Sequence, residues 1–198
     1  MCKVLLVTCN SDSTTSNLRS TALDAVGIIG RAEGGFSLRE RHLYARAIPD
    51  LSETVVAALR TNPDYRSAEQ WKAAACSDLL VQEVHGADVL VIAAPFENGR
   101  PPKELSDWGI HIGLAARCFT GQHKAVPRIP NKIAIVIAEG TNSEPETEAG
   151  LTTLCGDLRD YLKPLGVSEV ALFEADRSGY PLRSAQLMLV ISRSRSVH

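Results

Sequence analysis

Residues 88–117, DVLVIAAPFENGRPPKELSDWGIHIGLAAR, are the most informative part of this chain. Asp88 to Ala94 is a short apolar run closed by Pro95, a pattern typical of a strand buried on both faces of a parallel sheet. Two prolines follow at 101 and 102, and proline suits the first turn of a helix because its missing N–H would have no partner there. Apolar residues then recur at helical spacing, at Leu105, Trp108, Ile112 and Ala116. The stretch predicts a central strand, a loop over residues 95–100 and a helix.

The predicted loop over residues 95–100 is a candidate ligand site because of its position. In open α/β sheets, ligands bind outside the carboxyl ends of the strands, near the point where the strand order reverses. Position alone leaves open the alternative that these residues form an ordinary connection between a strand and a helix.

The amino-terminal part of the chain predicts a phosphate site. Lys3 to Thr8 is an apolar run that indicates a first, central strand, and the small or polar residues 9–17 follow it before Leu18 begins a helical pattern. This loop is rich in hydroxyl groups and precedes a helix N-terminus, where backbone N–H groups and the helix dipole favour an anion. The alternative is that one Ser or Thr caps the helix and the others are solvated. The chain has neither a Walker pattern nor a dinucleotide-binding glycine pattern.

The remaining segments alternate between strands and helices. Residues 36–44 follow Gly34 and Gly35, carry charges in both phases of a strand pattern, and predict an edge strand. Helices are expected over 52–61 and 67–86, and the inner face of the second is predicted at Ala68, Trp71, Ala75, Leu79 and Val84. A loop is expected over 118–130, followed by a strand over 131–138 and a helix over 147–165. A strand over 167–173 and a last helix over 184–196 complete the chain. This alternation predicts a doubly wound α/β fold with a parallel sheet.

Length and composition fit a single domain over residues 1–198. Lys and Arg number 21 against 23 acidic residues, and the net charge of -2 gives no general attraction to nucleic acid or to an anionic membrane. No apolar run approaches the roughly 20 residues of a membrane span, and the first residues lack a signal-peptide pattern, so a cytoplasmic protein is expected.

The five cysteines are odd in number, without a Cys-x-x-Cys pair, and are expected to be reduced thiols. No spacing of histidines with cysteines indicates a metal site, and His111 is interpreted as a packed or capping residue.

Residues 94–98, Ala-Pro-Phe-Glu-Asn, with Pro102, Leu105, Trp108 and His111, resemble a segment of the family of FMN-dependent NADH-azoreductases and quinone reductases. Members usually read Ala-Pro-Met-Tyr-Asn-Phe, then Gly, Ile, Pro and a helix with a Trp and a His, and the spacing matches without a gap. The resemblance implies a flavodoxin-like three-layer sandwich whose five-stranded parallel sheet has the order 2-1-3-4-5. It also implies ping-pong hydride transfer from NADH or NADPH through FMN to a quinone or azo compound. Family members are homodimers with sites at the subunit boundary, so a homodimer is expected.

The resemblance places the site residues in three loops. Hydroxyl groups after the first strand are expected to hold the FMN phosphate, and the loops after Ala94 and Ala138 are expected to line the flavin ring. The expected cofactor-binding residues are Cys9, Ser11, Ser13, Thr15, Ser16, Pro95, Phe96, Glu97, Asn98, Gly99, Glu139, Gly140 and Thr141. The candidate catalytic residues are Glu97, Asn98 and Glu139, and the expected substrate contacts are Arg100 and Phe119.

Several positions depart from the family pattern and leave the chemistry open. Glu97 stands where the family usually has Tyr, and Gly99 and Arg100 stand where it has Phe and Gly. The loss of two aromatic contacts is expected to weaken FMN binding by about tenfold or more. One interpretation is a flavin reductase retuned toward a polar substrate. Another is an enzyme on the same scaffold that has lost flavin and uses Glu97 or Glu139 as acid or base on a small biosynthetic substrate, with Arg100 as an anion clamp.

A binding protein without catalysis is the third interpretation, and the structural alternative for these charged side chains is that they pair with one another or face water. Cys9 ends the first strand, before the phosphate loop and a helix N-terminus. Its pKa is therefore expected to be lowered, although no paired base marks it as a nucleophile.

Overall fold

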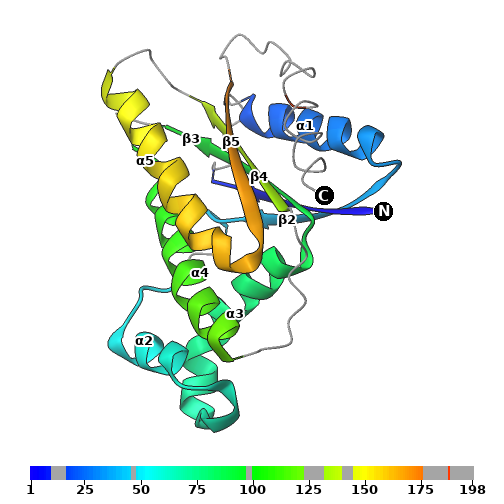
Figure 1. Ribbon diagram of the computed structural model, residues 1–198. Helices are drawn as coiled ribbons and strands as arrows, with labels where there is room; N and C mark the ends of the chain where they lie inside the picture. The colour runs from blue at the N-terminus through cyan, green and yellow to red at the C-terminus, as the bar shows by residue number, and fades with distance from the viewer. Residues whose placement is uncertain are drawn as a thin grey trace.

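Five parallel strands form the centre of the protein in a computed structural model that describes residues 1–9, 17–45, 48–96, 100–122, 132–139, 145–175 and 187. The strand order is β2-β1-β3-β4-β5 (Figure 1). The strands are β1 Cys2–Thr8, β2 Phe36–His42, β3 Val89–Pro95, β4 Lys132–Glu139 and β5 Val167–Ala175. This order confirms the predicted flavodoxin-like sheet.

The buried strands are the ones that the apolar runs predicted. In β3 and β4 every residue except the last is buried, because each strand has a neighbouring strand on both sides and helices over both faces. In β2 most residues are exposed, and β2 lies at the edge of the sheet, as its mixed charges predicted.

Helices cover both faces of the sheet, and the sheet separates two hydrophobic cores. The core on one face contains residues of α1, and the core on the other contains residues of α2, α3, α4 and α5. Figure 1 shows α1 on the opposite side of the sheet from α3, α4 and α5. The helices are α1 Leu18–Ala32, α2 Glu53–Arg60, η1 Pro63–Tyr65, α3 Ala68–Gly86, α4 Lys103–Gln122, α5 Pro145–Leu162 and η2 Lys163–Leu165. Within the described ranges, none of these helices is long and apolar enough to cross a membrane.

Local signals set several element boundaries. Ser52 caps α2 by accepting a hydrogen bond from the backbone N–H of Val55, and Ser67 and Gln70 form a reciprocal capping box at the start of α3. Gly34 and Gly35 have positive φ angles of 67° and 129°, a conformation that favours glycine, and they turn the chain from α1 into β2.

The predicted inner face of α3 is wrong. Of the five residues proposed for it, only Val84 is buried, whereas Trp71 and Leu79 are exposed. The buried residues of α3 are Ala74, Ser77, Leu80, Val81 and Val84. Apolar residues occur on both sides of this helix, so periodicity did not identify the inner side. The buried Ser77 pairs with His111 of α4, which a hydrophobic pattern does not anticipate.

Two other predicted segments lie partly outside the described part of the chain. The loop predicted over 118–130 begins too early, because α4 continues to Gln122, and residues 123–130 lie outside the described part of the chain. The last predicted helix, 184–196, also lies outside it except for Leu187, which is buried in the core on the α1 face.

Candidate functional site

The carboxyl ends of three adjacent strands meet at one edge of the sheet. The backbone N–H of Cys9, just after β1, donates to the carbonyl oxygen of Ala93 in β3 at 3.1 Å. The N–H of Phe96, just after β3, donates to the carbonyl of Glu139 at the end of β4 at 2.6 Å. From β1 the chain turns to β2 on one side, whereas β3 lies on the other side. The strand order therefore reverses between β1 and β3, and ligands of open α/β sheets bind outside such a reversal.

Of the predicted cofactor-binding residues, the structure describes four, and all four lie at this edge of the sheet. Pro95 is opposite Glu139 in the register of β3 and β4, and Cys9 and Phe96 follow β1 and β3 directly. The other predicted residues of the three loops lie outside the described residues and stay predictions: Ser11, Ser13, Thr15, Ser16, Glu97, Asn98, Gly99, Gly140 and Thr141.

The two predicted substrate contacts lie in different places. Arg100 is exposed and precedes the start of α4, close to the carboxyl end of β3. Phe119 lies near the opposite end of α4, and at about 1.5 Å per residue it is roughly 24 Å further along the helix axis than Lys103. The structure does not bring Phe119 to the edge of its own sheet where Arg100 lies.

The thiol of Cys9 is not activated. Its side chain is buried in the core on the α2–α5 face, away from α1. Burial raises the pKa of Cys9 to about 12, with a smaller contribution from the negative charge of Glu104. The expected lowering of this pKa by a helix N-terminus is therefore wrong, because the side chain points to the other face of the sheet. None of the four cysteines with described side chains is in a disulfide bond.

Phe96 and Glu139 differ in what they can offer a ligand. The ring of Phe96 is packed in the core on the α2–α5 face, so its predicted contact with a flavin stays a prediction. Glu139 is half-buried, and its carbonyl ties the end of β4 to the end of β3. The backbone hydrogen bond between Phe96 and Glu139 holds the end of β3 next to the end of β4, so the two predicted binding loops that follow these strands begin side by side.

A series of polar side-chain contacts at the ends of β1 and β2 was not predicted from the sequence. Thr8 and His42 are opposite each other in the register, and Thr8 Oγ1 lies 2.8 Å from His42 Nδ1. His42 Nε2 lies 3.4 Å from a carboxylate oxygen of Glu40, which also accepts a hydrogen bond from Arg19 of α1 at 2.9 Å. The charges in both phases of β2 indicated an edge strand. They did not indicate the contact between His42 and Thr8, because that contact depends on the register between β1 and β2.

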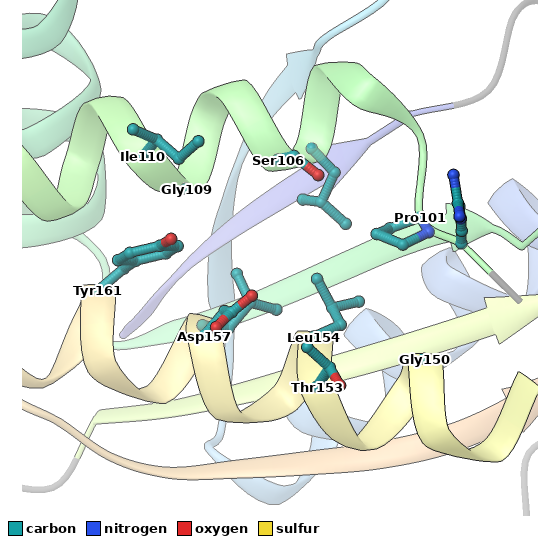
Figure 2. A pocket seen from close by; sticks show the side chains of 12 residues that line it. Pro101, Ser106, Gly109, Ile110, Gly150, Thr153, Leu154, Asp157 and Tyr161 are labelled. Atoms are coloured by element: carbon teal, nitrogen blue, oxygen red, sulfur yellow. The ribbon is translucent and has the colours of Figure 1, made fainter. Parts of the chain in front are cut away.

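A groove opens between α4 and α5, beginning next to the same edge. It has a volume of about 360 Å³. Figure 2 shows Pro101 near one end and Tyr161 near the other, with Leu154 and Asp157 between them. We call it the α4–α5 groove and define it by its lining residues, Arg100, Pro101, Leu105, Ser106, Gly109, Ile110, Gly150, Thr153, Leu154, Asp157, Leu158 and Tyr161.

Comparisons with known proteins agree with the fold. The family model described as a flavodoxin-like fold matches residues 2–190. A protein of Bordetella parapertussis named FMN-dependent NADH:quinone oxidoreductase is 29% identical over 196 residues, covering 98% of this chain and 92% of the relative. The azoreductase structure from Bacillus anthracis strain Sterne superposes with a TM-score of 0.67 at 18% identity, covering 98% of this chain and 95% of that one.

A second structure, an FMN-dependent NADH-azoreductase from Bacillus anthracis strain Ames Ancestor in complex with FMN, has a TM-score of 0.61 at 16% identity, covering 98% and 96%. At these identities the structural likeness establishes the fold alone. Because the family match covers nearly the whole chain, the protein belongs to the flavodoxin-like fold family.

Proposed function

We propose that this protein is an FMN-dependent NAD(P)H oxidoreductase that reduces quinones or azo compounds. The observation that carries the proposal is the meeting of the β1, β3 and β4 ends at the strand-order reversal, in a chain that aligns over 98% of its length with an FMN-dependent NADH:quinone oxidoreductase. The residues of the three loops that start there are the ones that the family resemblance assigned to FMN.

The start of α1 fits a phosphate group. Asn17 at the N-cap makes no side-chain capping hydrogen bond with the residues described, and the first turn of α1 has no acidic residue. Asn17 therefore does not compete with an anion at this helix start, and no carboxylate in the first turn repels one. The hydroxyl-rich residues 10–16 lead directly into this helix. The hydroxyl groups of these residues and the backbone N–H groups of the helix start are hydrogen-bond donors of the kind that would bind the phosphate of FMN.

The protein residues have binding and orienting roles in this proposal. Bound FMN would supply the redox chemistry, with NADH or NADPH as the electron donor. Cys9, Pro95 and Glu139 hold the ends of the strands from which the three binding loops depart. We also assign the exposed guanidinium of Arg100 to an anionic group on the acceptor. We propose that nicotinamide donor and acceptor use one pocket in turn, which gives ping-pong kinetics.

Flavin titration tests the proposal directly. The purified protein is expected to retain close to one FMN per chain after desalting, to lose the yellow colour on addition of NADH and to regain it with a quinone. Riboflavin, which lacks the phosphate, is the matched control ligand and is expected to bind about a hundredfold more weakly, because it does not use the helix N-terminus. A colourless protein whose melting temperature does not respond to FMN would contradict the proposal and favour acid–base chemistry by Glu97 or Glu139.

We also propose that the protein is a homodimer. Trp71 and Leu79 are 48% and 45% exposed on the outer side of α3. Large apolar side chains exposed on the outer side of a helix are available for contact with another protein chain. A dimer would also give Phe119 a role, since the far end of α4 can contribute to a site only in a partner subunit. We propose a cytoplasmic location, which the free thiols support.

A further inference from the structure

The α4–α5 groove has an apolar floor made by core residues. Leu105, Leu154 and Leu158 line it, and all three also belong to the core on the α2–α5 face. Pro101 and the partly exposed Ile110 add apolar surface at its sides. Its volume of about 360 Å³ lies at the lower end of the range of small-molecule sites, about 300 to 1,000 Å³. A compact ligand of one or two rings is therefore the size that this groove accepts.

Tyr161 closes one end of the groove in a fixed position. A Cβ atom on Gly109 would lie 2.9 Å from the Tyr161 ring, and one on Gly113 would lie 2.4 Å from it. The ring thus lies directly against the backbone of α4, where any side chain would exclude it. The Tyr161 side chain also lines the groove, at the end away from Pro101 (Figure 2). An aromatic ligand can pack against this ring edge to face or offset.

Opposite charges stand at two places along the groove. Arg100, the residue before Pro101 in the chain, lines the groove. Asp157 lines it between Leu154 and Tyr161 (Figure 2). Neither residue forms an ion pair with any side chain in the part of the chain that the structure describes. A ligand that presents an anion to Arg100 and a hydrogen-bond donor to Asp157 is complementary to both.

We propose that the α4–α5 groove is a binding site for an aryl monocarboxylate or monosulfonate that also carries a hydroxyl or amino group. The anionic oxygens accept hydrogen bonds from the Arg100 guanidinium, a geometry in which two parallel N–H donors match one carboxylate. The ring covers the leucine floor. The hydroxyl or amino group donates to Asp157, which is acceptor-only when ionised. This site adjoins the strand ends at which FMN is proposed to bind, and it shares Arg100 with the proposed acceptor contact.

A binding titration with 6-hydroxy-2-naphthoate tests the assignment, because this probe is fluorescent and carries both groups. Thr153→Phe fills the groove, and Thr152→Phe is its matched control. Both threonines are exposed on α5 and both donate their hydroxyls to a carbonyl four residues earlier, but only Thr153 lines the groove. We expect saturable one-site binding to the wild type and to Thr152→Phe, and a loss of about tenfold or more in affinity for Thr153→Phe.

Two further measurements test the charges. Arg100→Gln is expected to weaken the carboxylate probe by about tenfold and to remove most of the salt dependence of its binding. The neutral analogue 2-naphthol is expected to bind the wild type more weakly than the probe and to be indifferent to Arg100→Gln. Asp157→Asn is expected to reduce the advantage of 6-hydroxy-2-naphthoate over 2-naphthoate, because the amide lacks the ionised acceptor.

The assignment fails if the wild type does not bind the probe, or if Thr153→Phe binds it as well as Thr152→Phe does. It also fails if FMN displaces the probe competitively, since the probe would then occupy the strand-end site instead. The titrations measure binding rather than turnover and are done on the protein with and without added FMN. A failure of the proposed flavin chemistry would leave their outcome unchanged.

Discussion

At the scale of single residues, His111 joins three parts of the α2–α5 layer. Its Nε2 lies 2.8 Å from the carbonyl oxygen of Pro49, before α2, and its Nδ1 lies 2.7 Å from Ser77 Oγ in α3. A carbonyl only accepts, so Nε2 carries the proton and the neutral Nδ1 accepts from Ser77. Burial lowers the pKa of His111, opposed by the hydrogen bond to Pro49 and by the charge of Asp107. The neutral imidazole is the form that the fold selects.

This selection predicts a loss of stability in mild acid. Below the ordinary histidine pKa of about 6.5 the unfolded chain takes up a proton that the folded chain does not, so the free energy of unfolding falls as the pH decreases toward the lowered pKa of folded His111. Urea unfolding between about pH 5 and pH 8 measures the slope. The slope is expected to be shallower in His111→Asn. Ser77→Ala keeps the histidine and should keep the slope, while losing about 1 to 3 kcal/mol at every pH from the hydrogen bond. Equal slopes in wild type and His111→Asn would contradict the assignment.

Lys132 is a buried cation at the amino-terminal end of β4, at the end of the sheet opposite the candidate site. As the first residue of β4 it donates from Nζ to the carbonyl oxygens of Val84, at 3.2 Å, and His85, and so caps the C-terminus of α3. Burial lowers the pKa of Lys132 to about 8, opposed by the charge of Asp88. The ammonium group provides hydrogen-bond donors for two carbonyls at the end of α3, and its positive charge is stabilised by the negative end of the helix dipole.

Replacement of Lys132 by methionine has two expected effects. At pH 7 the variant is less stable by about 1 to 3 kcal/mol, because buried carbonyls lose their donor. Between about pH 8 and 10.5 the unfolded wild type holds more protons at this lysine than the folded protein, so wild-type stability gains a contribution that rises with pH. Chemical denaturation across this range should show that contribution missing in Lys132→Met. A variant with unchanged stability and unchanged slope would show that the lysine caps nothing.

At the scale of helices, the packing of α4 on α5 depends on Gly113. A Cβ there would lie 2.4 Å from the Tyr161 ring, whereas nothing lies within 4 Å of a Cβ built at Gly156 in α5. Gly113→Ala is expected to lose about 1 to 3 kcal/mol of stability because the ring must move. Gly156→Ala, the control, is expected to gain about 0.5 to 1 kcal/mol from helix propensity. Thermal unfolding of the two variants gives the comparison, and a stabilised Gly113→Ala would contradict the close packing.

The elements that could be predicted are those in which one signal dominates. The apolar runs of β1, β3 and β4 and the helical faces of α1 and α4 have a single interpretation, because burial on both faces or on one stripe leaves a clear pattern. The inner face of α3 could not be predicted, because α3 has apolar residues on two sides and buries a serine that only His111 explains.

The candidate site was predictable in position but not in detail. Strand ends in a doubly wound sheet determine where loops converge, and the family pattern at 94–98 indicated which loop matters. The thiol of Cys9 was assigned to the wrong face, since its direction follows from the pleat of β1 and not from the loop beside it. The pairing of Thr8 with His42 depends on strand register, and the α4–α5 groove depends on how closely Tyr161 approaches α4. Neither is a property of one segment.

At the scale of the whole molecule, the proposed homodimer would account for two features of the helices on the α2–α5 face. One is the exposed apolar side of α3 with Trp71 and Leu79, and the other is the position of Phe119 near the far end of α4. An interface on this helical layer would bury the first and bring the second toward a partner's site. Hydrophobic burial of such side chains contributes roughly 1.5 to 3 kcal/mol each.

Leu79→Arg is therefore expected to give monomers, because it places a charge in the centre of the proposed interface at each of two symmetry-related positions. Size-exclusion chromatography with light scattering measures the mass against 21.4 kDa for one chain. Leu172→Arg is the matched control, since Leu172 is also exposed, at 36%, but lies on the edge strand β5. This control should remain dimeric. If the wild type is monomeric, or if Leu172→Arg dissociates the dimer and Leu79→Arg does not, the interface is not on α3.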